Sequence, residues 1–144
     1  MLARARVVVG EVVARLTLSA LLEERPRVIA FVAEACRESG MPIDYEHAVI
    51  SAVGEAYNNV VLHSYRGAGG LVDIEIEQRR DRFTVRLRDT GDGFDPRRLR
   101  MPELDALPEG GMGMFIILRA MDEVSWYKEG VENVVTMVKR LPRR

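Results

Sequence analysis

A strict alternation of apolar and polar residues between positions 72 and 88 constrains the fold of this 144-residue chain more than any other feature. Apolar residues occupy the even positions from Val72 to Ile76 and the odd positions from Phe83 to Leu87. Successive side chains of a strand point to opposite faces, so each run predicts a strand with one apolar face. The short connection between the runs predicts an antiparallel hairpin that turns at Gln78–Asp81.

In the predicted register, apolar residues face apolar residues across the two strands, and acidic residues face arginines. Opposite charges face each other on the polar side, Glu77 with Arg82 and Asp73 with Arg86, and such pairs contribute about 0.2–1 kcal/mol each. We expect this charged face to be exposed to solvent. The pairs on the apolar face are Ile76 with Phe83, Ile74 with Val85, and Val72 with Leu87.

Asp89 continues the parity of Val85 and Leu87, which puts a carboxylate on the apolar face where the second strand ends. Two interpretations fit this position. Either the strand ends there and Asp89 caps the following turn, or its carboxylate reaches into a pocket. Gly91 and Gly93 follow within the sequence DTGDG, and glycines at alternate positions allow a ligand to approach the backbone closely.

The residues before the hairpin predict one long helix from Asp44, placed as its N-cap, to about Ser64. One face of this helix carries a carboxylate, an amide and an imidazole in line, beside small alanines. This pattern indicates that something polar lies against that face. Spacing alone leaves open a metal site, a catalytic pair, or buried polar groups satisfied by neighbours. The residues of this face, spaced by three or four positions, are Ala48, Ala52, Glu55, Asn59 and His63.

Other segments complete the expected elements. Irregular structure is expected at 96–109, as a lid or a disordered segment. The glycine run 110–113 before the last helix predicts either an anion site at a helix N-terminus or a simple turn. The remaining predicted elements are strands at Val7–Val9, Val12–Leu18, Val124–Tyr127 and Val134–Val138, and helices from Pro26 to about Ser39 and from Met114 to about Met121.

Composition excludes several classes of protein. The length predicts one domain, and a net charge of -1 argues against a nucleic-acid binder that relies on an overall positive field. The single Cys36 excludes an internal disulfide and a cysteine-based zinc site, and it suits a reducing cytoplasm. With only two histidines, a multi-histidine metal centre is not expected either. No run approaches the ~20 apolar residues of a membrane span, so we expect a cytoplasmic protein.

Three motifs in order resemble those of the GHKL ATPase/kinase superfamily, most closely its small bacterial branch, the anti-sigma-factor serine protein kinases. EAYNN with the following HSY is similar to the N-box of that branch, EAxxN followed by HxY. DTGDG is similar to its DxGxG box, GGMGM to its second glycine box, and MDEV after the last helix has the character of the branch. The resemblance covers roughly Leu16 to Leu141.

The resemblance implies a single histidine-kinase-like ATPase domain over residues 1–144, with a Bergerat-type ATP-binding fold. This fold is an α/β (α+β) sandwich with a mixed, mostly antiparallel sheet, helices on one face, and ATP held between helices and sheet. The lid would be 96–109, where Arg97, Arg98 and Arg100 contact phosphate or a partner, or else form a solvated basic face.

The same resemblance assigns roles to residues of the three motifs. Glu55 would be the catalytic base that draws the proton from an attacking hydroxyl, and Asn59 the Mg²⁺ ligand through its amide oxygen. Asp89 would accept a hydrogen bond from the adenine amino group. His63 we expect to be structural, at the helix end. The glycine-box residues expected to lie along the nucleotide are Gly91, Gly93, Gly111, Met112 and Gly113.

By resemblance, the function is that of a serine/threonine protein kinase that binds ATP and Mg²⁺, sequesters a sigma factor and phosphorylates an anti-anti-sigma protein. Relatives are often homodimers, and no direct contact with nucleic acid or membrane is implied. Glu132–Asn133 stands where many relatives carry Gly-Thr, and Glu109 where some carry arginine. The alternative is therefore an ATP-binding anti-sigma module with little or no kinase activity. A third reading, the detached ATPase domain of a histidine kinase, fits the short lid less well.

Overall fold

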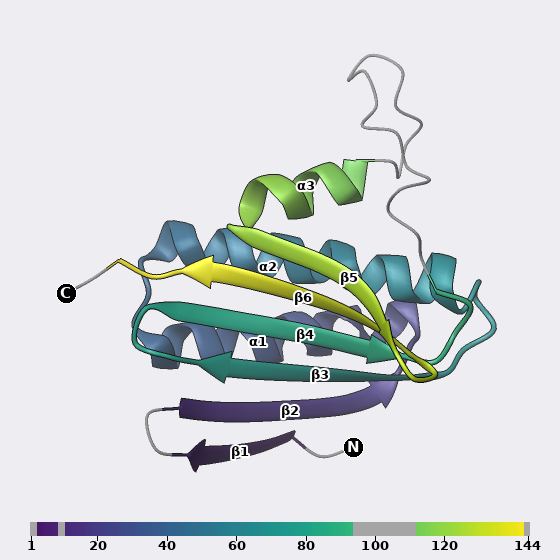
Figure 1. The fold of residues 1–144 in the computed structure, drawn as a ribbon, viewed down its shortest axis with the longest axis horizontal. Helices are drawn as coiled ribbons and strands as arrows, with labels where there is room; N and C mark the ends of the chain where they lie inside the picture. Colours follow the sequence, from purple (N-terminus) through teal and green to yellow (C-terminus); the bar gives the residue numbers. More distant parts are fainter. Residues whose placement is uncertain (1–2, 9–10, 94–111, 143–144) are drawn as a thin grey trace.

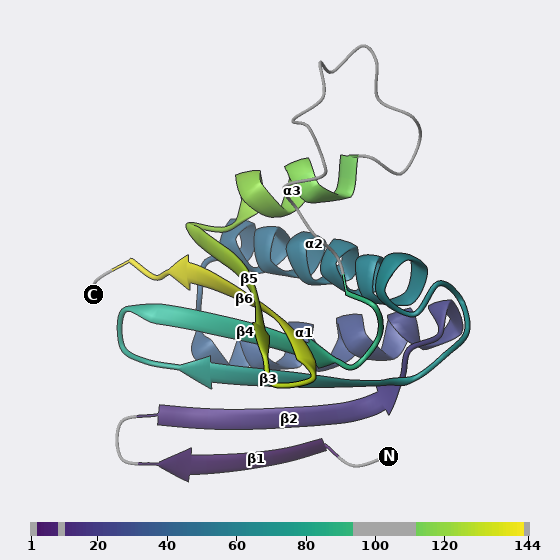
Figure 2. The same cartoon turned by 45° about the vertical axis from the view of Figure 1, so that its right-hand side comes forward.

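A six-stranded sheet carries the helices on one of its faces in the computed structural model, which describes residues 3–8, 11–93 and 112–142 (Figure 1 and Figure 2). The strands lie in the order β1-β2-β3-β4-β6-β5, and each neighbouring pair runs antiparallel. This arrangement confirms the expected α+β sandwich. The expected lid at 96–109 and Gly111 lie outside the described residues.

The elements follow the predicted order along the chain. The strands are β1 (Ala3–Val8), β2 (Glu11–Ser19), β3 (Leu71–Gln78), β4 (Arg82–Asp89), β5 (Glu123–Glu129) and β6 (Glu132–Arg140). The helices are α1 (Arg25–Ser39), α2 (Ile43–Asn59) and α3 (Met112–Ala120), with a 3-10 turn at Leu22–Glu24 before α1 and a π-helical turn at Val60–Ser64 after α2.

The core lies between the sheet and the helices α1 and α2. The even positions of β3 from Val72 to Ile76 and the odd positions of β4 are buried, as their alternation predicts. The buried Tyr57 of α2 donates its hydroxyl proton to Leu21 O at 2.6 Å and accepts a bond from Leu21 N at 3.0 Å. This side chain fastens α2 to the β2–α1 connection. None of the helices in the described ranges is long and apolar enough to cross a bilayer.

The predicted register of the β3–β4 hairpin is wrong by two residues. Ile76 lies opposite Val85 and not Phe83, and the other predicted pairs shift with it. The cause is the turn, which is centred on Arg80–Asp81 because Arg79 N donates to Arg82 O at 2.9 Å. A shift of two residues keeps every side chain on its predicted face.

The predicted N-cap of α2 is also wrong. The helix begins at Ile43, after Pro42 in an extended conformation with ψ 149°. The Pro42 carbonyl accepts bonds from Tyr45 N at 3.0 Å and from Glu46 N at 3.1 Å. Asp44 therefore lies inside the first turn, where a negative charge still interacts favourably with the helix dipole.

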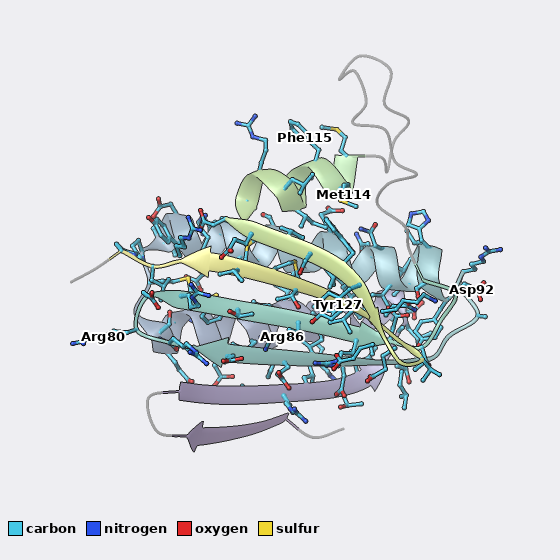
Figure 3. All side chains as sticks on the ribbon, viewed as in Figure 1. Arg80, Arg86, Asp92, Met114, Phe115 and Tyr127 are labelled. Atoms are coloured by element: carbon cyan, nitrogen blue, oxygen red, sulfur yellow. The ribbon has the colours of Figure 1, made fainter. Side chains whose placement is uncertain are left out.

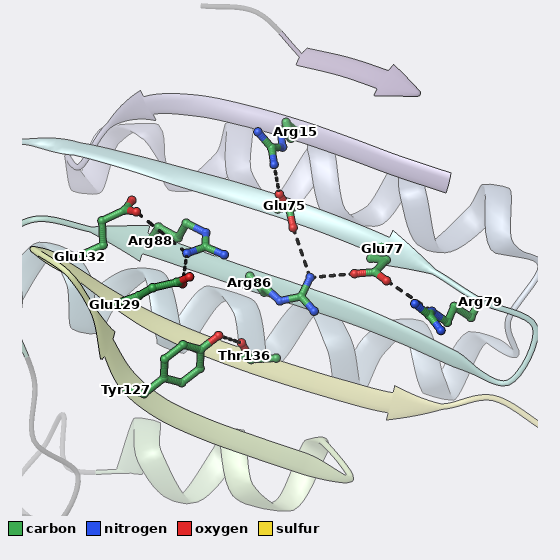
Figure 4. A network of polar contacts seen from close by, with 10 residues as sticks. All are labelled: Arg15, Glu75, Glu77, Arg79, Arg86, Arg88, Tyr127, Glu129, Glu132 and Thr136. Atoms are coloured by element: carbon green, nitrogen blue, oxygen red, sulfur yellow. Dashed lines mark hydrogen bonds and ion pairs between the residues drawn. The ribbon is translucent and has the colours of Figure 1, made fainter. Parts of the chain in front are cut away.

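The face of the sheet away from the helices carries a ladder of ion pairs across the strands (Figure 4). Arg86 binds Glu75 at 3.2 Å and Glu77 at 2.8 Å, and Glu75 also pairs with Arg15. The hydrogen bond from Arg86 holds the pKa of Glu77 below its ordinary value. The charges lie on the open face as expected, but in different pairs, because of the shifted turn.

Candidate functional site

Contacts join the described residues of the motifs beside the turn after β4, whose Asp92 lies at the end of the sheet opposite the β3–β4 turn that carries Arg80 (Figure 3). Helix α2 with the π-helical turn after it, strands β4 and β6, and the start of α3 supply these residues. Residues more than 40 positions apart in the chain thus form one site.

Asp89 is the buried centre of this site, with 5% of its surface exposed. Three donors converge on its Oδ1 atom: Gly91 N at 3.0 Å, Asn133 Nδ2 at 2.9 Å, and the Ser64 hydroxyl. Within the described residues, no hydrogen bond reaches Oδ2. The interpretation of Asp89 as a cap of the turn is confirmed, because Oδ1 accepts the bond from Gly91 N, and the pocket interpretation stays a prediction.

The turn after β4 lies directly against its neighbours. A Cβ on Gly91 would stand 2.4 Å from Ser64 O, and a Cβ on Gly93 would stand 2.6 Å from Asn133 Oδ1. Gly93 also has φ 89°, a backbone conformation that residues other than glycine rarely adopt. The two glycines therefore let this turn pack closely against Ser64 and Asn133.

Ser64 is a site residue that the sequence analysis missed. An α-helix would continue the Glu55–Asn59 face at His63, four positions on, but the π-helical turn closes with bonds five positions apart, such as Tyr65 N to Val60 O at 3.0 Å. Ser64 is consequently buried, while His63 is exposed. The Ser64 hydroxyl accepts a bond from Gly93 N at 3.1 Å, and its carbonyl accepts one from Asp92 N at 2.8 Å.

Tyr65 braces the same turn from its other side. Its hydroxyl donates to Leu71 O at 2.6 Å and accepts a bond from Thr90 N at 2.9 Å. A Cβ on Gly70 would stand 2.2 Å from the Tyr65 ring, so only glycine fits beneath it. The HSY sequence thus supplies two side chains, Ser64 and Tyr65, that hold the turn carrying Asp89.

Glu55 brings α2 to the start of α3. A Cβ on Gly113 would lie 2.7 Å from Glu55 Oε2, so the carboxylate stands against the first turn of α3. A negative charge is favoured there by the free N–H groups and by the helix dipole. Helix α3 begins at Met112, two residues before the predicted start, and Met112 itself is exposed.

Asn59 lies one helical turn after Glu55 and has bonding capacity to spare. Its Nδ2 atom is buried and lacks a hydrogen-bond partner within the described residues. Buried amides are normally paired, so this N–H donor suits an acceptor, such as a phosphate oxygen, that the chain does not itself supply. Among all the residues that the structure describes, no three His, Cys, Asp or Glu side chains could together hold a metal ion. The amide oxygen of Asn59 is a ligand of the kind that Mg²⁺ takes together with waters and phosphate oxygens.

Comparisons with known proteins agree with this geometry. A family model described as the histidine kinase-like ATPase domain matches residues 18–139. The serine-protein kinase RsbW of Staphylococcus aureus strain MRSA252 and that of strain bovine RF122 / ET3-1 are each 38% identical to the chain over 96 residues, which is 60% of this chain and 60% of the relative. The chain therefore matches less than two thirds of the length of these curated relatives.

A solved structure supports the fold. It contains the RsbU and RsbW domains of a Mycobacterium tuberculosis protein, and it superposes with a TM-score of 0.67 at 18% identity. The match covers 92% of this chain and 34% of that one. At this level of identity the likeness concerns the arrangement of the elements.

Proposed function

Because the chain belongs to the histidine kinase-like ATPase family, we propose that it is a Mg²⁺- and ATP-dependent serine/threonine protein kinase that sequesters a sigma factor and phosphorylates an anti-anti-sigma protein. Relatives named serine-protein kinase support the transferase activity. The proposal includes a cytoplasmic location, a homodimer, and a single ATPase domain over residues 1–144.

The observation that carries the proposal is that the described parts of all three motifs meet at one end of the sheet. The N-box contacts the first glycine box through Ser64 and Asp89. It contacts the second through Glu55 and Gly113. The metal-binding amide of Asn59, the base Glu55 and the nucleobase acceptor Asp89 would then lie around one nucleotide.

Each residue has a task that its surroundings support. Oδ2 of Asp89, which no described residue bonds, would accept a hydrogen bond from the adenine amino group, and Asn59 would hold Mg²⁺ through its amide oxygen. Mg²⁺, when bound, would neutralise charge on the phosphate oxygens. Backbone N–H groups of the segment from Gly111 to Gly113 would face the phosphates at the start of α3. Glu55 would accept the proton of the substrate hydroxyl as that oxygen attacks the γ-phosphorus, while the bond from the γ-phosphorus to the β,γ-bridging oxygen breaks and ADP leaves with its electron pair.

The second candidate function is an ATP-responsive anti-sigma module with little or no transfer. The packing of the Glu55 carboxylate against Gly113 favours it, because a base held there would have to move before it met a substrate hydroxyl. The replacement of Gly-Thr by Glu132–Asn133 and the presence of Glu109 point the same way.

Phosphate transfer from radiolabelled ATP to the cognate antagonist protein separates the two functions. We expect transfer by the unmodified protein and a loss of about 10²–10⁴-fold in kcat for Glu55→Gln, with the Kd for ATP nearly unchanged. Glu34→Gln, an exposed carboxylate on α1, is the matched control. ATP binding without any transfer would establish the binding module instead, and an absence of ATP binding would overturn both functions.

A further inference from the structure

We propose that the Ser64–Asn133 pair fixes the Asp89 carboxylate so that the site selects adenine over guanine. The two side chains are positioning residues, because they act on the nucleobase through Asp89. The inference rests on the proposed function, since it concerns how the same site reads its nucleotide.

The first step is the saturation of one carboxylate oxygen. The Ser64 hydroxyl, Asn133 Nδ2 and Gly91 N all donate to Oδ1 of Asp89, which is buried. A carboxylate oxygen has about two lone-pair sites, so three donors leave no capacity on Oδ1. The single oxygen left for a ligand is Oδ2.

Saturation of Oδ1 excludes one mode of base recognition. A carboxylate with two free oxygens can accept two parallel bonds, as it does from arginine, and guanine offers a matching pair of donors at N1 and at the 2-amino group. With Oδ1 occupied, that pair cannot be satisfied. Adenine needs one acceptor for its 6-amino group, whereas guanine presents a carbonyl oxygen at that position, which a carboxylate oxygen repels. The arrangement therefore favours adenine and also acts against guanine.

Asn133 is held in place well enough to perform this task. Its Nδ2 carries two hydrogens, and the second is donated to Gly91 O at 2.9 Å. The residue lies directly opposite Asp89 in the β4–β6 ladder, and its Oδ1 lies over Gly93. A threonine at this position has one hydroxyl proton and could not bond both Asp89 and Gly91. Asn133 therefore ties the carboxylate and the turn together, which one hydroxyl proton cannot do.

Ser64 completes the pair from the other side. Its hydroxyl accepts a hydrogen bond from Gly93 N at 3.1 Å and donates one to Oδ1 of Asp89. Ser64 is 3% exposed, so water does not replace this contact easily. The π-helical turn that delivers Ser64 is thus part of the base-recognition apparatus.

The test measures Kd values of the full chain with Mg²⁺ for ATP, GTP and purine riboside triphosphate, which lacks the 6-amino group. We expect the unmodified protein to prefer ATP over both. Asn133→Asp, nearly isosteric but without the two donors, should reduce the ATP-to-GTP preference at least tenfold, and Ser64→Ala should reduce it by a smaller factor. Asn133→Thr keeps one donor and should fall between Asn133→Asp and the unmodified protein.

Thr136→Val is the matched control, because it removes a hydroxyl from β6 that bonds Tyr127 on the open face. A general loss of structure would weaken all three nucleotides together, so the ratio of Kd values isolates the positioning role. Unchanged ratios in Asn133→Asp and Ser64→Ala, with ATP still bound, would overturn the inference and leave the proposed function standing. A failure of the unmodified protein to bind ATP would overturn both. Should Asn133→Asp fail to fold by circular dichroism, Ser64→Ala decides the question.

Discussion

At the scale of single residues, Gly113 stands where the preference of a helix for alanine conflicts with the space that the Glu55 carboxylate occupies. Alanine is favoured over glycine within a helix by about 1 kcal/mol. A Cβ at this position, however, would stand 2.7 Å from Glu55 Oε2, so the carboxylate would have to move. Glycine is therefore explained by the approach of Glu55 and not by helix formation.

We predict that Gly113→Ala leaves the melting temperature equal or higher while phosphate transfer falls by about tenfold, an order of magnitude that corresponds to 1.4 kcal/mol. Thermal melts by circular dichroism and the transfer assay measure the two effects separately. Adding Gly113→Ala to Glu55→Ala should cause no further fall in phosphate transfer, because the clash with the carboxylate is then absent. A fall in melting temperature together with full activity would contradict this reading.

At the scale of elements, the β3–β4 hairpin is held by charges on its open face. The hydrogen bond and the charge of Arg86 hold the pKa of Glu77 below its ordinary value of 4.5. A depressed pKa in the folded state contributes stability that is present above the unfolded value and is lost as pH falls through the folded value. The ladder in Figure 4 therefore stabilises the sheet at neutral pH and weakens in acid.

Glu77→Gln should accordingly lower the free energy of unfolding by about 1 kcal/mol at pH 7. The difference from the unmodified protein should shrink as pH falls from 4.5 through the lower pKa of the folded state, because the unfolded chain gains the proton on Glu77 first. Urea titrations across this pH range measure it, with the exposed Glu34→Gln as the comparison. A difference that stays constant with pH would mean that packing, and not charge, is lost.

At the scale of the whole molecule, a nucleotide that joins α2, α3, β4 and β6 should stabilise the fold as a unit. A ligand at one hundred times its Kd contributes about 2.7 kcal/mol, which corresponds to a rise of roughly 5–10 °C in the melting temperature of a domain of this size. We expect this rise with ATP and Mg²⁺ together, and a smaller one with ATP and a chelator.

Asn59→Ala should remove most of the Mg²⁺-dependent part of the rise and leave the remainder. Differential scanning fluorimetry measures both parts, and Ser51→Ala, an exposed position on the same helix, is the control. Equal rises with and without Mg²⁺ in the unmodified protein would count against the role of Asn59, since its amide would then contribute nothing through the metal.

Local patterns were sufficient to predict the elements and the faces they bury. Alternation reports only how neighbouring side chains point, so it identified β3 and β4 and put Asp89 on the apolar side. It could not position the turn between them, because Leu141 N, from the far end of the chain, donates to Asp81 O within that turn. The register was consequently wrong by two residues although every face was right.

The sequence by itself determined the elements, the faces they bury and the order of the three motifs, and it predicted roles for Glu55, Asn59 and Asp89. Only the tertiary structure decided which side chains complete the site. Ser64 lies 25 residues from Asp89 and Asn133 lies 44 residues from it, and a π-helical turn replaces the spacing of four by one of five. Such contacts depend on how separate segments pack against each other, which periodicity along one segment does not encode.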